Sequence, residues 1–201
     1  MKEATDQARS AQMDAFLRVL DPADNSVGGG TASAMAAAMA SALVAMVARL
    51  SVGKPGLEPE SFYRPIIEDA ELLAKELMEG GRADARAFGD LMRAYRLPKT
   101  SEVEKRFRRE VTQRAMLAAA LAPLGNARRC RRVMELQRSL VGRSNPSASS
   151  DLSCAAYLAF AGLRGCLENV RVNLRLIEDG TEARAISTEL DELERFVKEN
   201  G

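Results

Sequence analysis

The sequence predicts an all-α protein, and three observations support that prediction. Ala, Leu, Met, Glu and Arg dominate the 201 residues, and all five are strong helix formers. Aromatic residues make up only 4% of the chain, which favours helices packed through small side chains over aromatic-rich sheets. Apolar residues recur at helical spacing along most of the chain. We therefore expect a single domain, residues 1–201, built as a bundle of about seven to eight helices around a buried alanine-rich helix.

The first two helices are predicted from an amphipathic stretch and an uncharged one. From about Glu3 to Leu20, apolar residues share one helical face, and the stretch ends at Asp21-Pro22. From Thr31 to Ala48 the chain is almost wholly Ala, Met, Ser, Leu and Val, with small residues every four positions, so neighbouring helices can approach closely. This run is at the short limit for crossing a bilayer and has no aromatic belt. We expect a core helix there and no membrane partner.

Six further helices are predicted from breaks and caps in the sequence. Ser101 and Glu104 form a capping box, Pro123 marks a break, and Ser149 or Ser150 is expected to cap the helix that follows. The expected ranges are Glu60–Met78, ending at Gly80-Gly81; Ala83–Tyr95; Ser101–Leu121; Leu124–Val141; Asp151 to about Ile177; and a last helix that carries Ile186, Leu190, Leu193, Phe196 and Val197.

Composition excludes several kinds of catalytic site. The chain has no histidine, which removes Ser-His and Cys-His triads and histidine zinc sites. Catalysis must therefore use Asp, Glu, Lys, Asn or Arg. Cys130, Cys154 and Cys166 lack metal-ligand spacing, and their context predicts reduced, buried thiols and no bound metal. The first nine residues are charged and polar, unlike a signal peptide, so we expect a cytoplasmic protein.

Charge is nearly balanced overall but uneven along the chain. The formal net charge is +1, whereas Arg93 to Arg143 holds fourteen Lys or Arg against four Glu. That segment can bind an anionic ligand, or it can be an ordinary solvated helix face. The Arg128–Arg132 cluster leaves nucleic-acid binding open, but no aromatic platform or docking motif accompanies it, so no nucleic-acid partner is expected.

The turn Gly28-Gly29-Gly30-Thr31 opens the alanine-rich helix. Free amide hydrogens at a helix start, together with the positive end of the helix dipole, suit a carboxylate or phosphate, and glycines let a ligand approach. No Gly-Lys-Ser/Thr follows and no strand precedes, so neither a Walker loop nor a dinucleotide fingerprint is present. A flexible turn remains the alternative.

Several short motifs, in order over roughly residues 12 to 178, together resemble those of the formiminotransferase-cyclodeaminase and methenyltetrahydrofolate-cyclohydrolase family. They are the Gly28–Thr31 turn, Met46-Val47-x-x-Leu50-Ser51, Gly53-Lys54, Asp84-x3-Phe88, Ala94–Lys99, Asn145-x5-Asp151 and Asn169-Val170-x2-Asn173-Leu174. Three positions depart from the family pattern: Val27 stands for a proline, Ser144 for a glycine and Leu57 for a tyrosine.

The resemblance implies an enzyme of folate one-carbon metabolism. It implies hydrolysis of 5,10-methenyltetrahydrofolate to 10-formyltetrahydrofolate or, as the alternative, cyclisation of 5-formiminotetrahydrofolate with loss of ammonia. A helical folate-binding or interaction protein that has lost catalysis is the third possibility, motivated by the three departures. The implied substrate is a tetrahydrofolate adduct with or without a polyglutamate tail, no cofactor is needed, and the resemblance and the small-residue faces both favour a homodimer.

Three residues are candidates for catalysis, each with a structural alternative. Lys54 is the leading acid/base because burial near other cations can lower a lysine pKa, although it can equally be a cation at a helix end. Asp84 can hold the pterin ring or orient water, or it can pair with a neighbouring arginine. Asp151 is supported by the family spacing, but a first-turn aspartate is often only stabilising.

The remaining candidates are expected to bind substrate. Gly28, Gly29, Gly30 and Thr31 form the helix-start site, and Arg96 and Lys99 can pair with the glutamate tail or form a plain basic turn. Asn145 precedes the polar loop before Asp151. Asn169 and Asn173 lie one turn apart on an apolar helix, where they can contact substrate or bond to another helix.

Overall fold

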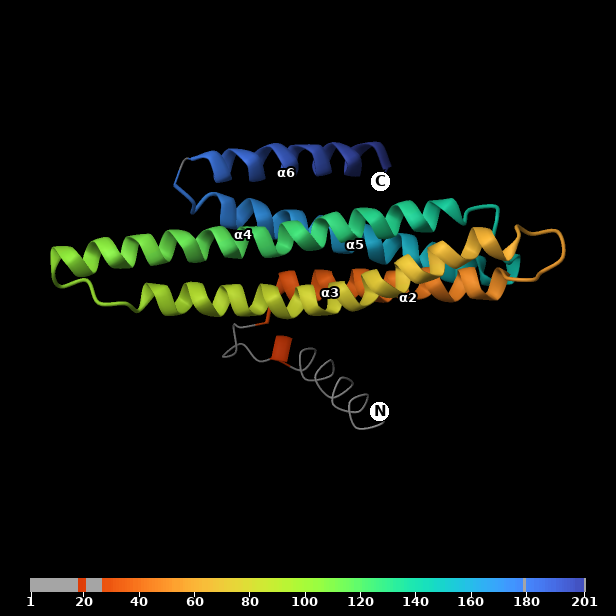
Figure 1. The fold of residues 1–201 in the computed structure, drawn as a ribbon, viewed down its shortest axis with the longest axis horizontal. Helices are drawn as coiled ribbons and strands as arrows, with labels where there is room; N and C mark the ends of the chain where they lie inside the picture. The colour runs from red at the N-terminus through yellow and green to blue at the C-terminus, as the bar shows by residue number, and fades with distance from the viewer. Residues whose placement is uncertain (1–17, 21–26, 179, 201) are drawn as a thin grey trace.

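The computed structural model describes residues 18–20, 27–178 and 180–200, and it contains only helices and their connections there (Figure 1). The elements are α2 (Gly29–Ser51), α3 (Glu60–Tyr95), α4 (Glu102–Ser139), the 3-10 helix η1 (Pro146–Ala148), α5 (Ser149–Leu174) and α6 (Thr181–Asn200). The expected first helix, Glu3–Leu20, lies outside the described residues except for its last three positions. The all-α prediction is confirmed for the described part of the chain.

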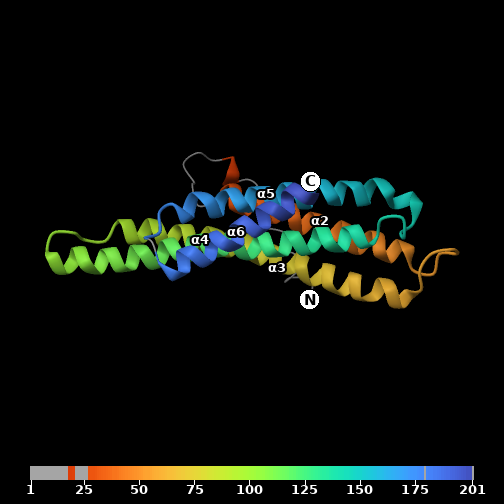
Figure 2. The same cartoon turned by 90° about the horizontal axis from the view of Figure 1, so that it is seen from above.

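Helices α2 to α5 run side by side in alternating directions, and α6 lies on the outside over α4 and α5 (Figures 1 and 2). Helix α2 has 23 residues and α3 has 36, so α3 continues past the start of α2. Together α3 and α4 project beyond the other helices at that end, held by a small apolar cluster of Ala87, Leu91, Met116 and Ala119. The start of α2 therefore abuts the middle of α3.

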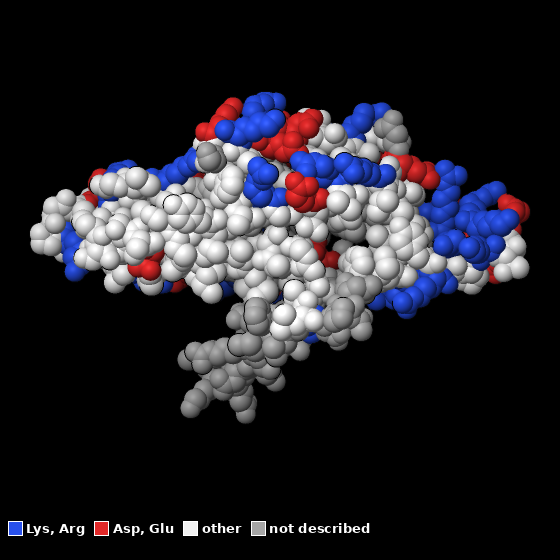
Figure 3. Space-filling model, turned by 180° about the vertical axis from the view of Figure 1, so that it is seen from behind, with Lys and Arg blue, Asp and Glu red and all other residues white. Residues whose placement is uncertain are grey.

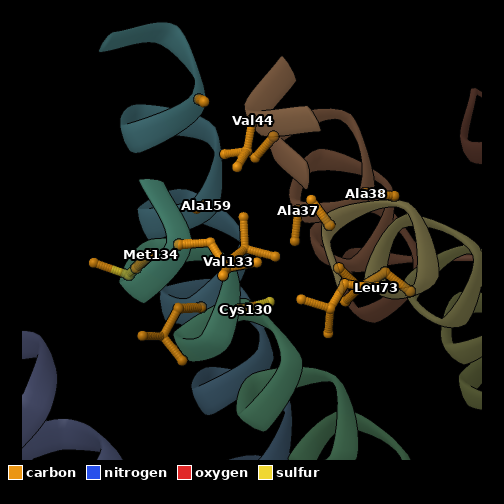
Figure 4. Close-up of a cluster of buried hydrophobic side chains, with 14 of the residues drawn as sticks. Ala37, Ala38, Val44, Leu73, Cys130, Val133, Met134 and Ala159 are labelled. Atoms are coloured by element: carbon orange, nitrogen blue, oxygen red, sulfur yellow. The ribbon is translucent and has the colours of Figure 1, made fainter. Parts of the chain in front are cut away.

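Helix α2 is the predicted alanine-rich core helix. Its apolar window is long enough to cross a membrane, yet more than half of that window is buried inside the protein, against α3 and α5. Small side chains allow this packing: Ala37 and Ala159 are fully buried between α2 and α5, beside Val133 of α4 (Figure 4). A Cβ placed on Gly162 would lie 2.8 Å from the Ser33 carbonyl oxygen, so α5 approaches the backbone of α2.

The predicted break at Gly80-Gly81 is wrong, because α3 runs through both glycines. Here glycine allows close contact between helices. An added Cβ on Gly80 would lie 1.8 Å from Oδ1 of the buried Asn126, and one on Gly81 would lie 3.4 Å from the Ala34 Cβ. Thr31 Oγ1 donates a hydrogen bond to the Gly81 carbonyl at 3.2 Å, which ties the start of α2 to α3. Packing here outweighs the low helix propensity of glycine.

The predicted break at Pro123 is also wrong. Pro123 is buried inside the continuous helix α4, and its missing N–H leaves the Ala119 carbonyl without its helical donor. Asn173 of α5 supplies a replacement, because its Nδ2 donates to the Ala119 oxygen at 2.8 Å. These two unbroken helices are why the described residues hold five α-helices, fewer than the seven to eight expected.

Smaller predictions gave mixed results. The capping box is confirmed, since Glu104 N donates to Ser101 Oγ and Ser101 N donates to the Glu104 carboxylate. The expected Ser149 or Ser150 cap is wrong, because α5 already includes both residues and starts after Ala148. Cys130 and Cys166 are free and buried as predicted, but Cys154 is exposed.

We expect Asn173→Ala to cost about 1–2 kcal/mol of unfolding free energy, because it leaves the buried Ala119 carbonyl unpaired. In a Pro123→Ala background the N–H of residue 123 can bond to that carbonyl again, so the cost of Asn173→Ala should shrink well below 1 kcal/mol. Urea unfolding of the four proteins in this cycle measures both numbers. An equal cost in the two backgrounds would show that Asn173 does not compensate for the proline.

Candidate functional site

Asp84 and Gly30 meet at the step where α2 begins against α3. A Cβ on Gly30 would lie 2.1 Å from Asp84 Oδ2 and 2.8 Å from Oδ1, so only glycine fits beside the carboxylate in this arrangement. Asp84 forms no hydrogen bond or ion pair with any residue that the structure describes. The neighbouring Arg82 and Arg86 both bond to Glu79, at 3.3 and 2.7 Å. The alternative that Asp84 pairs with an adjacent arginine is therefore wrong.

Burial raises the pKa of Asp84 from 3.8 to about 6. The start of α2 carries partial positive charge, which favours a nearby carboxylate once it is ionised. A carboxyl group in this environment can hold a proton or release it close to neutral pH. That is the property required of a general acid or base.

The first turn of α2 leaves backbone donors next to Asp84. Gly28 caps the helix without a side-chain hydrogen bond, and the first bond within the helix runs from Ala32 N to Gly28 O at 3.0 Å. The amide hydrogens of Gly29, Gly30 and Thr31 precede that bond, so no helical carbonyl accepts them. No acidic residue occupies this turn. Gly28 and Gly29 are exposed whereas Gly30 and Thr31 are buried, so an anionic or carbonyl group can approach this turn from the side of the first two glycines.

Asn169 of α5 lies against the same turn. A Cβ on Gly29 would be 3.5 Å from Asn169 Nδ2, which donates to the Gly165 carbonyl at 2.8 Å. The side-chain oxygen of Asn169, Oδ1, can accept a hydrogen bond from a ligand. The structure therefore brings together residues from three helices: Gly28–Thr31 of α2, Asp84 of α3 and Asn169 of α5.

Lys54, Asn145 and Asp151 lie at the opposite end of the bundle. Lys54 follows the end of α2, about 33 Å along the helix axis from Gly29. Asn145 has a structural task there: its N–H donates to Ser51 Oγ at 2.8 Å and its Nδ2 to the Leu50 carbonyl at 3.2 Å. Lys54 is exposed, with no partner among the described residues. Within one chain, the predicted catalytic residues do not form one site.

Arg96 and Lys99 occupy a third place, the turn between α3 and α4. Lys99 lines a hollow of about 380 Å³, whereas the exposed Arg96 does not. Arg108 contributes a buried Nε without a hydrogen-bond partner, and its Nη2 donates to the Tyr95 carbonyl. Lys and Arg gather at this end of the molecule, at the right of Figure 3. The residues that line the hollow are Tyr95, Lys99, Lys105, Arg108, Arg109, Thr112 and Gln113.

An apolar hollow of about 490 Å³ lies between α2 and α3 and was not predicted from the sequence. Its size is typical of a ligand pocket, and it reaches Arg82, two residues before Asp84. The lining residues are Met35, Ala38, Met39, Ala42, Ala74, Lys75, Met78 and Arg82. The helical spacing of the methionines is the sequence feature that could have indicated this hollow. The same spacing is equally consistent with methionines in the hydrophobic core. Among the described residues no group of His, Cys, Asp or Glu could hold a metal ion.

Comparison with known proteins gives a consistent result. The family model for formiminotransferase-cyclodeaminase matches residues 12–192. A methenyltetrahydrofolate cyclohydrolase from Methylorubrum extorquens is 36% identical over 96% of this chain and 92% of its own length. The formimidoyltransferase-cyclodeaminase of Gallus gallus is 31% identical over 83% of this chain, which covers only 31% of that enzyme. The crystal structure of a formiminotetrahydrofolate cyclodeaminase from Thermotoga maritima superposes with a TM-score of 0.78 at 30% identity, over 90% of this chain and 86% of that one.

The raised pKa of Asp84 makes stability depend on pH. The folded state binds this proton more tightly than the unfolded state does, so protonation of Asp84 contributes stability below about pH 4 that is lost as pH rises through about 6. We expect a loss of up to about 3 kcal/mol from this residue between pH 4 and pH 7. Urea unfolding should show Asp84→Asn becoming more stable, relative to the wild type, as pH rises. Asp90→Asn, an exposed control on the same helix, should show no such trend, and a pH-independent difference for Asp84→Asn would contradict the raised pKa.

Proposed function

The chain belongs to the formiminotransferase-cyclodeaminase family, and we propose that it is a folate enzyme that hydrolyses 5,10-methenyltetrahydrofolate to 10-formyltetrahydrofolate. One observation supports this most directly: the partly buried carboxyl group of Asp84, which has no partner among the described residues, lies against the start of α2. The relative named as a cyclohydrolase matches this chain over nearly its whole length, which favours hydrolysis over the alternatives.

The reaction needs one proton to move from water to nitrogen. Water adds to the methenyl carbon between N5 and N10 and gives up a proton, which produces a neutral tetrahedral carbon bearing a hydroxyl group. The bond from that carbon to N5 then breaks, the hydroxyl oxygen becomes the formyl oxygen, and N5 takes up a proton. The net change is uptake of one water and release of one proton, because the methenyl substrate carries the positive charge.

Asp84 can perform the first proton transfer. Its carboxylate form is available near neutral pH and accepts the proton of the attacking water, and its protonated form can return that proton to N5. The carboxylate also stabilises the positive charge that the methenyl group carries before attack. The amides of Gly29 and Gly30 can donate to the oxygen as it becomes a carbonyl.

The rest of the substrate can follow α3 in both directions from Asp84. The pterin is a flat ring system with polar edges, and its faces can pack against Met35 and Met78 in the apolar hollow. The tail, with or without polyglutamate, can run toward Lys99, which follows α3, and toward Arg108 of α4, which bonds to the last residue of α3. Tyr95 lies eleven positions after Asp84, about 16 Å along the helix, a length that the p-aminobenzoyl group and a short glutamate tail can cover.

The cyclodeaminase reaction is the second candidate, and the Thermotoga structure favours it. In that reaction N10 attacks the formimino carbon, and ammonia leaves with a proton. The same Asp84, in its protonated form, can protonate the departing amine, so one arrangement of residues serves both reactions. A helical protein that binds folate without chemistry is the third candidate.

We also infer that neither reaction requires a cofactor or metal beyond the folate itself, that the enzyme works in the cytoplasm, and that it is a homodimer. The homodimer is supported by an apolar surface on α2, on which Met39 is 58% and Leu50 is 46% exposed.

Hydrolysis is tested by mixing the protein with 5,10-methenyltetrahydrofolate and following its near-ultraviolet absorbance against the uncatalysed rate. We expect acceleration by the wild type, a loss of at least about 100-fold in kcat for Asp84→Asn, and little change for Asp90→Asn. If the wild type does not accelerate hydrolysis, the assay is repeated with 5-formiminotetrahydrofolate and detection of ammonia. If neither substrate reacts, the third candidate, a protein that binds folate without chemistry, is favoured. Full activity of Asp84→Asn on either substrate would remove Asp84 from the mechanism.

Gly30→Ala tests the contact between the start of α2 and Asp84. The added methyl group overlaps both carboxylate oxygens, so the carboxyl group must move, and we expect activity to fall at least about 10-fold while the helical circular dichroism is retained. Gly89→Ala is the matched control on α3, since its Cβ would meet only Arg93 Nη1 at an ordinary 3.6 Å. Equal activity of the two variants would show that the contact does not position the carboxylate.

A further inference from the structure

Asn126 of α4 carries a fully buried amide group without a hydrogen-bond partner. Its exposed fraction is 0%, and neither Nδ2 nor Oδ1 bonds to any residue that the structure describes. Buried polar groups in folded proteins nearly always bond to protein or to ordered water, because an unpaired one is costly. The surroundings of Asn126 therefore decide what completes its hydrogen bonds.

The amide of Asn126 lies against α3 at Gly80. A Cβ on Gly80 would lie 1.8 Å from Oδ1 and 3.2 Å from Nδ2 of Asn126, so the absence of a side chain there makes room for the amide. The next residue, Gly81, faces α2, where an added Cβ would meet Ala34 and Thr31. Adjacent positions of α3 thus face two different helices, α4 and α2.

Asp84 lies on the part of α3 that faces the junction between those two helices. It follows Gly80 by four positions and Gly81 by three, which places it about 40° from the first and about 60° from the second around the helix axis. Its contact with Gly30 of α2 agrees with this direction. Asp84 and the Asn126 amide therefore share one face of α3, a single helical turn apart.

Helix direction brings these two side chains toward each other. Helices α3 and α4 are antiparallel neighbours (Figures 1 and 2). Side chains tilt toward the first residue of their helix, so Asp84 tilts along α3 toward Gly80, and Asn126 tilts along α4 toward Asp84. Both tilts shorten the rise of one turn, about 6 Å for four residues. Asn126 forms no direct hydrogen bond to Asp84, and the remaining span suits one bridging water.

Helix α4 offers Asp84 no other side-chain partner at this level. The contact between Gly80 and Asn126 sets the register of the two helices, so Ala122 and Pro123, one turn before Asn126, lie at the level of Asp84. Neither side chain has a polar atom. The amide of Asn126 is therefore the polar side chain of α4 that lies nearest to the carboxyl group.

No free charge on the surrounding helices competes for Asp84. Helix α2 has no charged residue before Arg49, and α4 has none between Arg114 and Arg128. Burial accordingly raises the pKa of Asp84, and a hydrogen bond to its carboxylate opposes that rise. The nearby charged residues of α3 and α5 are paired with one another: Arg82 and Arg86 with Glu79, and Glu168 with Arg171.

We propose that Asn126 is a positioning residue for Asp84, and that the two side chains hold an ordered water molecule between them. An amide suits this role because it both donates and accepts. With Asp84 ionised, Nδ2 donates to the water and the water donates to the carboxylate. With Asp84 protonated, its O–H donates to the water and the water donates to Oδ1. The ionised form gains more, because hydrogen bonds to a charge are stronger.

The side-chain signals of Asn126 test this coupling in the wild-type protein. The ¹H and ¹⁵N shifts of its NH2 group should follow pH with a midpoint at the pKa of Asp84, about 6, and Asp84→Asn should abolish that dependence. A nuclear Overhauser effect should connect the NH2 group to a bound water. Gln137, a buried amide of α4 that donates to the Leu152 carbonyl at 3.2 Å, is the internal control and should not titrate. Asn126 signals that do not change with pH overturn the proposal, and a titrating NH2 group without a bound water overturns the bridge.

Asn126→Leu removes the amide while keeping a side chain of similar size. The carboxylate loses its hydrogen-bonded water, so we expect the pKa of Asp84, followed by its ¹³C carboxyl signal, to rise by about 1 pH unit. The role in catalysis rests on the proposed function: the acid limb of the kcat profile should move upward equally, with KM little changed. Asn126→Ser keeps a hydroxyl group for the water and should retain the wild-type limb. Gln137→Leu, the matched control on α4, should change neither the pKa nor the limb.

The outcomes separate this inference from the proposed function. The NMR titrations need no folate, so a wild type inactive on both folate substrates contradicts the proposed function while the titrations still decide the pairing. An active wild type whose Asp84 titrates identically after Asn126→Leu contradicts the role of Asn126 and leaves the proposed function standing. If Asn126→Leu does not fold, the titration of the wild-type NH2 group decides.

Discussion

The close approach of α2 to its neighbours is the constraint on which the rest of the structure depends. At Gly30, Gly81 and Gly162 the absence of a side chain lets two helices come within contact of backbone or of a polar group. Alanines fill the positions between, as at Ala37 and Ala159. Larger residues would push α3 and α5 away, and the Asp84 carboxyl group would then face solvent instead of the start of α2. Its raised pKa is therefore a consequence of packing between small residues.

The same packing explains which sequence predictions failed. The composition identified an all-α protein and the core helix correctly, because the small side chains of a long uncharged alanine-rich run let neighbouring helices pack closely against it. Gly80-Gly81 and Pro123 are local helix breakers, and a sequence alone does not show what lies opposite them. Asn126 and Thr31 pack against the glycines, and Asn173 replaces the donor that the proline lacks. Each compensation comes from a residue distant in the chain, so only the folded structure reveals it.

The sequence predicted the residues of the candidate site but not which of them lie together in the fold. Family spacing pointed to Asp84, Asn169 and the Gly28–Thr31 turn, and the structure places these on three helices around one helix start. Lys54 was the leading acid/base candidate from the sequence, yet it follows the far end of α2, about 33 Å from Gly29. Sequence spacing shows that these residues belong to one set of motifs, whereas helix length and direction decide which of them lie together in the fold. The hollow lined by Met35 and Met78 went unnoticed because methionines on a helix usually indicate core.

The proposed function requires folate to bind where α2 begins. An amide NMR titration of the ¹⁵N-labelled protein with 5-formyltetrahydrofolate, a stable relative of the substrate, tests it most directly, since the amides of Gly29, Gly30 and Thr31 report on their own hydrogen bonds. We expect saturable shifts that are largest for these three amides and for residues around Asp84 and Asn169. Saturable binding that leaves those amides unmoved, with shifts confined to another surface, would contradict it.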